Sequence, residues 1–355
     1  MKQFVSLLTA LVVAAAPILD ASASAKHPPS KAKIAKAKAG KAKPSPSKPK
    51  SRKAAVAAAV AVAAVAAVSS IDYAGEQINF SDWQAVRDFV DEMVAKHGFE
   101  RGALENQMRQ VRFVESAVQL VKPAPPGKPK NWQAYSARFI EPIRINAGLR
   151  FWNENAAALA RAEAAYGVPA EILVGIIGVE TVYGRDTGRF RVLDTLTTLA
   201  FAYPEAPNKA ARSVFFRGEL ENALLLARHE NIDPFTLLGS FAGAVGMPQF
   251  MPGNVLKYGV DFHGDGHIDL RGSTQDAIGS VANFLIEHGW KPSDTGPNVI
   301  PVDVAAHRAW EPLLERGLAA TLRADELTAA GVVSPVALPA DRLYGLPATA
   351  LWNHT

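Results

Sequence analysis

The feature that most constrains this chain is an apolar stretch that ends in a single acidic residue. Residues 169–185 read PAEILVGIIGVETVYGR, and the eight residues before Glu180 are all apolar or glycine. Pro169 is typical of a helix start and Gly184 of a helix end, so we expect a helix over 170–183. A helix of this composition is buried on most sides. It therefore carries Glu180 to the edge of a hydrophobic core.

This position suits Glu180 for acid chemistry. Apolar surroundings and the negative end of the helix dipole both favour the protonated carboxyl and raise its pKa. A carboxyl that keeps its proton near neutral pH is what a glycosidase general acid requires. A structural role remains open at this point, in which Glu180 pairs with Arg185 or Arg189 at the helix end.

The composition excludes several classes of chemistry. The 355 residues contain no cysteine, which excludes disulfides, thiolate metal sites, a cysteine nucleophile and a lipidated N-terminal cysteine. No phosphate-binding glycine loop, HExxH or GxSxG motif stands out, and the eight histidines lack zinc spacing. Hydrophobic residues make up 48% of the chain, enough for a substantial core.

The basic residues are concentrated in one segment. Residues 26–53 hold eleven Lys or Arg and no acid, so the total formal charge of +4 leaves a net charge of −7 for the rest. An acidic body argues against nucleic-acid binding. Residues 1–25 resemble a cleaved signal peptide, with Lys2 before an apolar stretch. We expect 26–70, a Lys/Ala/Pro-rich piece and an Ala/Val run, to be a disordered tether.

The remaining pattern is mainly α. Ser81 is a candidate cap for the first helix, which Gly98 closes. Further helices are expected over 100–121, 132–139, 145–166, 170–183, 214–230, 234–238, 252–258 and 274–288. After Trp290 short pieces rich in Pro, Gly, Val and Leu indicate a small β-containing or irregular module.

Several motifs together resemble the lytic murein transglycosylase B family of peptidoglycan lyases. They occur in the same order over roughly residues 78–300: KHGF, FW, YGVPAEI, GIIGVETVYGR, LDTLTTLAF, FFRGELE, GSFAGAVGMPQFMP, VDFHGDGHIDL and DAIGSVANF. The resemblance implies a lysozyme-like helical core with a small β-containing C-terminal module. It assigns 71–290 to the catalytic domain and 291–355 to that module.

The resemblance also implies the reaction. In the family, the glutamate that matches Glu180 protonates the glycosidic oxygen between N-acetylmuramic acid and N-acetylglucosamine. It then accepts the proton of the muramic-acid C6 hydroxyl as a 1,6-anhydro ring closes. Ordinary glycosidases need two carboxyls, and we interpret the nearby Asp186 and Asp194 as structural. Two alternatives stay open: a lysozyme-type hydrolase, and a truncated, non-catalytic peptidoglycan-binding protein.

By the same resemblance, a further set of residues belongs to the substrate cleft. Ser240 and Gln249 are expected to bond hydroxyl or acetamido groups, and Phe250 to stack on a sugar. Phe284 stands where the family often has tyrosine. Arg212 matches one of two arginines that meet peptide stems. The set is Tyr135, Arg212, Ser240, Gln249, Phe250 and Phe284.

The loop after residue 260 has the opening of an EF-hand-like calcium loop, with acidic oxygens at its first, fifth and ninth positions. His263 at the third position and Gly272 at the twelfth depart from the pattern, and the resemblance lets Asp276 close the ring. The candidate ligands are Asp261, His263, Asp265, His267 and Asp276. We expect that no cofactor is required and that any calcium is structural.

The remaining expectations concern the whole protein. The partners are peptidoglycan glycan strands, without nucleic acid or nucleotide, and the protein is a monomer. The location is the periplasm, reached by a cleaved signal and without a lipid anchor. The family normally continues with an aromatic-rich strand and a closing helix after the point that residues 342–347 match, so 291–355 is expected to be truncated.

Overall fold

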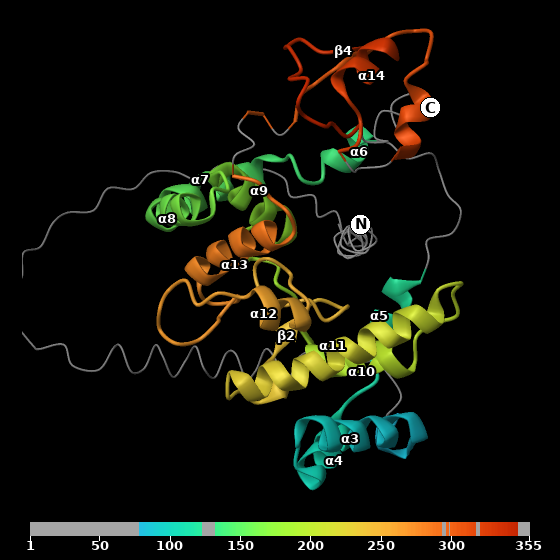
Figure 1. Cartoon of the computed structure of the whole chain (residues 1–355). Helices are drawn as coiled ribbons and strands as arrows, with labels where there is room; N and C mark the ends of the chain where they lie inside the picture. Colours follow the sequence, from blue (N-terminus) through green and yellow to red (C-terminus); the bar gives the residue numbers. More distant parts are fainter. Residues whose placement is uncertain (1–77, 123–131, 293–295, 298, 317–319, 347–355) are drawn as a thin grey trace, which may run out of the picture. The chain divides into compact units, whose positions relative to one another are not determined.

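We describe the protein from a computed structural model (Figure 1). It describes residues 78–122, 132–292, 296–297, 299–316 and 320–346. The expected signal peptide, 1–25, and tether, 26–70, lie outside the described residues. The chain divides into two compact units, Met1–Val121 and Lys122–Thr355.

The described part of the first unit is helical. Its elements are η1 (Phe80–Asp82), α3 (Gln84–His97), α4 (Arg101–Gln110) and α5 (Glu115–Val121). Gly98 ends α3 in the left-handed conformation, as expected. Two details differ from expectation. Ser81 lies inside η1, and Trp83 takes the N-cap position of α3. The helix expected over 100–121 is interrupted at 111–114, where the buried side chains of Val111 and Val114 face the core.

The second unit contains the longer helical array. Its first elements are α6 (Trp132–Ser136), α7 (Pro142–Glu154), α8 (Ala156–Tyr166), α9 (Ala170–Thr181), β1 (Phe190–Arg191), α10 (Val192–Phe201) and α11 (Lys209–His229). They are followed by η2 (Pro234–Thr236), β2 (Leu238–Gly239), α12 (Pro252–Tyr258) and α13 (Thr274–Glu287). Strands β1 and β2 pair antiparallel. The prediction of a mainly α fold is confirmed.

A hydrophobic cluster surrounds α9. Helix α13 packs against α8 and α9, and α7 packs against α9 (Figure 1). Leu173 and Ile177 of α9 are fully buried in this cluster with Ile278 of α13. The apolar pattern of α9 therefore reflects burial on several sides, as the sequence predicts.

The helix expected over 145–166 is two helices that meet at Asn155. Its side-chain amide donates to Phe151 O at 2.9 Å, and its Oδ1 accepts from the Thr274 hydroxyl at 2.7 Å. Asn competes well for backbone groups and favours caps over helix interiors. This bond to α13 fixes the bend between α7 and α8.

Helix α10 was not predicted. It packs along α11, which in turn packs against α12 (Figure 1). Residues 192–200 are all buried, including Thr195, Thr197 and Thr198. Threonine is a weak helix former because its branched side chain is restricted in a helix. Burial against the neighbouring helices therefore stabilises α10 despite the weak helix propensity of its threonines.

A separate hydrophobic cluster gathers around Trp310 between residues 302 and 346. It includes η3 (Glu311–Arg316), α14 (Ala324–Ala329) and the antiparallel strands β3 (Asp303–Val304) and β4 (Val332–Val333). Trp310 donates its indole N–H to Ala305 O at 3.1 Å. The region contains a pair of strands, as expected. That it forms a separate module stays a prediction.

No single helix in the described ranges is both long and apolar enough for a membrane span. Helices α8 and α9 reach that length and hydropathy only when taken together, and they meet at a bend of 116°.

Thr197 provides a test of the packing around α10. Its hydroxyl is fully buried and has no hydrogen-bond partner among the described residues. We expect Thr197→Val to raise the free energy of unfolding by about 1 kcal/mol, because it removes an unsatisfied polar group and keeps the shape. Thermal and urea denaturation measure the change. The matched control is Thr195→Val, which loses a 3.1 Å bond to Val192 O and should be destabilising. The opposite ranking of the two variants would contradict this interpretation.

Candidate active site

Glu180 lies one residue before the end of α9 and is half-buried. Burial raises the pKa of its carboxyl from the ordinary value to about 7, and desolvation is the only cause. Within the described residues, no ion pair or hydrogen bond reaches the carboxyl. The alternative pairing with Arg185 or Arg189 is not formed, and both arginines are exposed. The carboxyl is therefore desolvated without a compensating charge.

Helix α9 ends at Thr181, two residues earlier than expected. The next residues turn sharply: Val182, Tyr183 and Gly184 all have positive φ, at 50°, 60° and 87°. A left-handed conformation is uncommon for a β-branched residue and costs free energy. It places the side chain of Tyr183 back against the helix that precedes it.

Two glycines form the slot for the Tyr183 ring. A Cβ atom added to Gly178 would lie 2.3 Å from the Tyr183 hydroxyl oxygen, and one added to Gly148 would lie 2.4 Å from it. The ring also packs on Phe151, with centroids 5.0 Å apart. Burial raises the pKa of Tyr183. The slot explains why α9 and α7 each carry a glycine at their contact.

Arg144 of α7 also contacts this end of α9. Its Nε donates to Gly178 O at 2.8 Å, and its guanidinium lies 5.4 Å from the centre of the Phe139 ring. The ring of Tyr135 on α6 is 5.2 Å from Phe139 and is half-buried. The structure therefore connects Tyr135 to α9 through Phe139 and Arg144.

The segment 239–252 forms a tight loop without a charged residue. Isolated bridges pair Gly239 with Val245 and Val245 with Phe250. The Ser240 hydroxyl accepts from Ala244 N at 3.1 Å. Gln249 has a positive φ of 51°, and its amide nitrogen donates to Gly246 O at 2.9 Å.

This loop is joined to the segment that follows Glu180. The Thr181 hydroxyl donates to Met247 O at 2.8 Å, and the Gln249 amide nitrogen also donates to Thr187 O at 3.3 Å. A Cβ atom on Gly188 would lie 2.0 Å from Gly239 O, so the two backbones touch. The structure thus brings the segments that carry Glu180, Ser240 and Gln249 together, although they lie far apart in the sequence.

The aromatic residues of the predicted cleft need a correction. Phe250 is 7% exposed, so its ring is not available to stack on a sugar. It packs instead on Phe284, at 5.0 Å between centroids. Phe284 is half-buried and stacks on His288 at 4.0 Å. Phe250 is thus part of the packing beneath Phe284.

Arg212 lies on α11, outside the segments that carry Glu180, Ser240 and Gln249. Its guanidinium lies over the rings of Phe215 and Phe216, at 5.3 and 4.9 Å from their centres. Its side chain is half-buried. Among the described residues, its contacts are with these two rings and not with the loop 239–252 or Glu180.

The two rival acids are placed differently from Glu180. Asp194 is fully buried and makes a bidentate pair with Arg191, at 2.6 and 3.0 Å. Asp186 is exposed, and its backbone N–H donates to Thr181 O. These contacts fit the structural interpretation of both residues.

Glu219 was not among the residues predicted for the site. This half-buried residue of α11 accepts a hydrogen bond from Gly253 N at 2.8 Å, at the first turn of α12. Burial raises its pKa, and the bonds from Gly253 and Asn222 oppose that shift. Glu219 thus caps the helix that follows the loop 239–252. A glutamate from another helix leaves no local cap signature, so sequence spacing could not reveal it.

The acidic residues of the predicted calcium loop bind backbone N–H groups. Asp261 accepts from Gly264 and Gly266, which holds its pKa below the ordinary value. Asp276 is buried and accepts from His263 N at 2.8 Å and Asp269 N at 3.1 Å. These bonds fix the shape of the loop.

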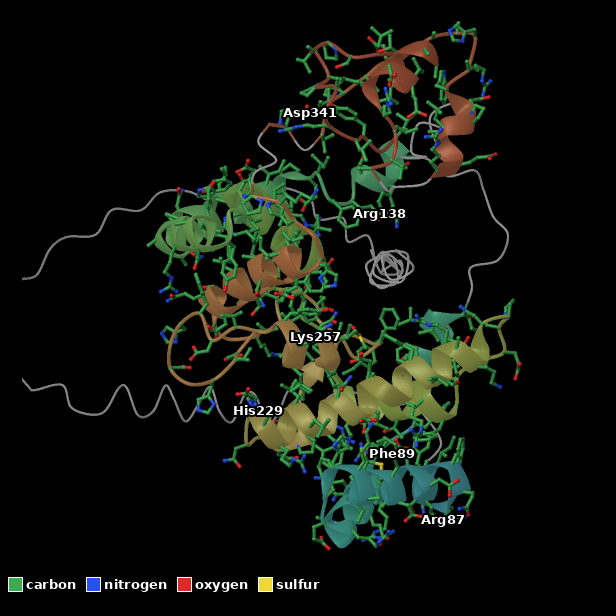
Figure 2. All side chains as sticks on the ribbon, viewed as in Figure 1. Arg87, Phe89, Arg138, His229, Lys257 and Asp341 are labelled. Atoms are coloured by element: carbon green, nitrogen blue, oxygen red, sulfur yellow. The ribbon has the colours of Figure 1, made fainter. Side chains whose placement is uncertain are left out.

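The histidines of this loop pair with acids. His263 lies 3.4 Å from Asp265, and His267 lies 3.3 Å from Glu230. Glu230 also contacts His229, the last residue of α11, labelled in Figure 2. In the described part of the chain, no group of three or more His, Cys, Asp or Glu side chains is arranged to hold a metal ion. The five predicted ligands are therefore not brought together as one set.

Comparisons with known proteins show which proteins this chain is similar to. A family model described as "Transglycosylase SLT domain" matches residues 81–349. The membrane-bound lytic murein transglycosylase B of Escherichia coli K12 is 47% identical over 225 residues, which is 61% of this chain and 60% of that protein. The match thus spans less than two thirds of this relative.

Solved structures are also similar. The soluble lytic transglycosylase SltB1 of Pseudomonas aeruginosa is 44% identical, with a TM-score of 0.64 over 71% of this chain and 82% of that chain. The E. coli lytic transglycosylase Slt35 is 38% identical, with a TM-score of 0.67 over 81% and 92%. Slt35 has been solved in complex with bulgecin A and in complex with calcium. The chain therefore has the lysozyme-like fold of these lytic transglycosylases.

The glycine slot beneath Tyr183 yields a paired test. We expect Gly178→Ala to lower the free energy of unfolding by about 1–3 kcal/mol, because the added methyl overlaps the Tyr183 hydroxyl. Gly175, on the exposed side of the same helix, has nothing within 4 Å of its Cβ position. Gly175→Ala should therefore raise stability by about 0.5–1 kcal/mol. Thermal denaturation of both variants measures the difference. Equal effects of the two substitutions on stability would contradict the interpretation that Gly178 makes room for the Tyr183 ring.

Proposed function

Because this chain belongs to the transglycosylase SLT domain family, we propose that it is a lytic transglycosylase of peptidoglycan. It cleaves the β-1,4 bond between N-acetylmuramic acid and N-acetylglucosamine and leaves 1,6-anhydro-N-acetylmuramic acid ends. The observation that carries this proposal is Glu180, desolvated at the end of α9 with a pKa of about 7. The murein transglycosylase activity named for the E. coli relative supports it.

Glu180 performs both proton transfers in this proposal. As an acid it gives its proton to the glycosidic oxygen, and the bond to C1 of the muramic acid breaks. As a base it then takes the proton of the C6 hydroxyl, and that oxygen bonds to C1. The protein ends the cycle with Glu180 protonated again, and no water is consumed.

Among the described residues, neither rival acid near Glu180 in the sequence shares its desolvated position, which supports a lyase over a hydrolase. Retaining and inverting glycosidases hold two carboxyl groups about 5–10 Å apart. Of the two rivals near Glu180 in sequence, Asp194 is neutralised by Arg191 and Asp186 is exposed. An internal hydroxyl as the attacking group removes the need for a second base.

Ser240 and Gln249 are proposed to bind the glycan from the loop 239–252. The Ser240 hydroxyl accepts from Ala244 N, so its own proton is available for a sugar oxygen. The Gln249 amide nitrogen bonds to the protein, and its Oε1 can accept an N–H or O–H of an acetamido or hydroxyl group. Tyr135 and Phe284 offer partly exposed rings to the sugar, and Arg212 offers a charge to the carboxylates of a peptide stem.

We propose that the protein acts in the cell envelope, as the name of the membrane-bound relative suggests. The proposed export signal, 1–25, has the charge and hydrophobic pattern of a cleaved secretory peptide. The proposed partner is the peptidoglycan glycan strand.

Replacing the proposed acid is the direct test. We expect Glu180→Gln to lower the release of anhydro-muropeptides from purified sacculi by about 10²-fold or more, because it removes the proton donor and keeps the shape. Mass spectrometry of the digest measures the products. Retention of a tenth of the wild-type rate would place the acid elsewhere. Reducing ends would indicate the hydrolase, and binding to sacculi without any product would indicate a non-catalytic protein.

The pH dependence provides the control for this test. The wild-type rate should fall as pH rises through about 7, because Glu180 then loses the proton that the reaction needs. Because the folded-state pKa of Glu180 is raised from 4.5 to about 7, the free energy of unfolding falls as pH rises between these two values, and the loss is complete at pH 8. Glu180→Gln should therefore melt no lower than the wild type at pH 8. A lower melting temperature would mean that the lost activity reflects misfolding.

We also propose that the loop 261–276 binds calcium weakly and that the chemistry does not require the ion. The spacing of its acidic oxygens and the calcium complex of Slt35 support binding. The carboxylates of Asp261 and Asp276 already bind N–H groups, so a calcium ion must displace or share those bonds. That competition is the reason for weak binding.

Calcium titration tests this proposal. Ligand binding to the native state raises stability by about 0.4 kcal/mol when the calcium concentration equals Kd, and by about 2.7 kcal/mol at a hundred times Kd. We expect millimolar calcium to raise the melting temperature by a few degrees. Asp265→Ala should abolish the shift, and Asp186→Ala, an exposed acid outside the loop, should keep it. A melting temperature unaffected by calcium and by chelator would remove the site from consideration.

A further inference from the structure

The turn after Glu180 is conformationally strained and must be held by its surroundings. Val182, Tyr183 and Gly184 adopt positive φ in succession. Only glycine adopts this conformation without cost, so the first two positions need compensating contacts. Tyr183 has the glycine slot described above. The other contact is made by the hydroxyl of Thr181, the residue directly after Glu180.

The Thr181 hydroxyl uses both of its hydrogen-bonding functions. It accepts from Gly184 N at 3.0 Å, which closes the turn, and donates to Met247 O at 2.8 Å, in the loop 239–252. Thr181 is fully buried and Met247 is buried, whereas Gly184 is half-buried, so water is excluded chiefly from the bond to Met247 O. Loss of the hydroxyl would leave the Gly184 N–H and the buried Met247 C=O without this partner.

The bond to Met247 reaches the middle of the loop. Met247 N donates to Leu270 O at 2.7 Å, so both backbone polar groups of Met247 are hydrogen-bonded. Two side-chain hydrogen bonds in the described residues join 181–189 to this loop: the Thr181 bond at 2.8 Å and the Gln249 bond at 3.3 Å. The Thr181 bond is the shorter, and it starts next to Glu180.

From these contacts we propose that Thr181 is a positioning residue, which fixes the separation between the Glu180 carboxyl and the loop that carries Ser240 and Gln249. This inference rests on the proposed function, because it assumes that acid and loop act on one glycan. Efficient proton transfer needs the acid within hydrogen-bond reach of the glycosidic oxygen, so small displacements of the loop or the acid slow the reaction.

The chemistry of the contact predicts which substitutions are tolerated. Valine has nearly the shape of threonine and lacks the donor and the acceptor. Serine keeps both and lacks one methyl group. A role in packing alone would make Thr181→Val the milder change. A positioning role makes Thr181→Ser the milder change, because the two hydrogen bonds survive.

Hydrogen exchange and product release test the proposal in the full-length chain, with Thr195→Val as the matched control. Thr195 is equally buried, but its hydroxyl bonds to Val192 O within α10. At matched temperature and folded fraction, we expect Thr181→Val to speed amide exchange in peptides covering 239–252 at least tenfold. Thr181→Ser and Thr195→Val should stay within threefold of the wild type. Anhydro-muropeptide release from sacculi should follow the same ranking.

Each outcome bears on the proposal. If Thr181→Val exchanges in 239–252 like Thr195→Val, the hydroxyl does not hold the loop, and the inference is wrong. The same holds if exchange quickens but anhydro-muropeptide release per folded molecule does not fall. Release of reducing ends by the wild type would overturn the proposed lyase, and the exchange comparison would still decide whether Thr181 holds the loop. A Thr181→Ser variant as impaired as Thr181→Val would assign the residue to packing.

Discussion

The desolvation of one carboxyl at the end of α9 governs the arrangement around it. Burial favours the neutral acid, and a nearby cation would reverse this effect. Arg185 and Arg189, which follow Glu180 closely in the sequence, are exposed and do not pair with it. Arg144 donates to the carbonyl of Gly178, and Arg191 is paired with Asp194. The neighbouring loop, 239–252, contains no charge. The pKa of about 7 is thus a property of the whole neighbourhood.

The strained turn ends α9 at Thr181, one residue after the half-buried Glu180. If α9 continued past Thr181 as expected, the residues after Glu180 would run on along the helix axis. The left-handed turn instead folds Tyr183 back against Gly148 and Gly178. The chain then leaves the helix within a few residues, and the half-buried carboxyl stays at its end. The glycines in α9 weaken it as a helix, but Gly178 makes room for this turn.

The sequence predicts the parts of this arrangement that depend on local pattern. The apolar run of α9, its start at Pro169 and the burial around Glu180 follow from composition and end signals. The break at Asn155 depends on a bond to Thr274, which lies far away in the chain. Helix α10 depends on burial that overrides the weak propensity of threonine. The sequence could not separate a Phe250 that faces a sugar from one that supports Phe284, because both positions call for an aromatic ring.

The acidic loop 261–276 supports the proposed cleft through its contacts with neighbouring segments. Its last turn lies against the loop that carries Gln249, since Met247 N donates to Leu270 O and a Cβ on Gly246 would touch Leu270. Arg271 adds bonds to Leu238 O and Gly188 O, which span β2 and the segment after Glu180. Whatever holds the acidic loop in shape therefore also holds one side of the proposed cleft. Within the described residues, carboxylates that accept backbone N–H groups hold the loop in this shape.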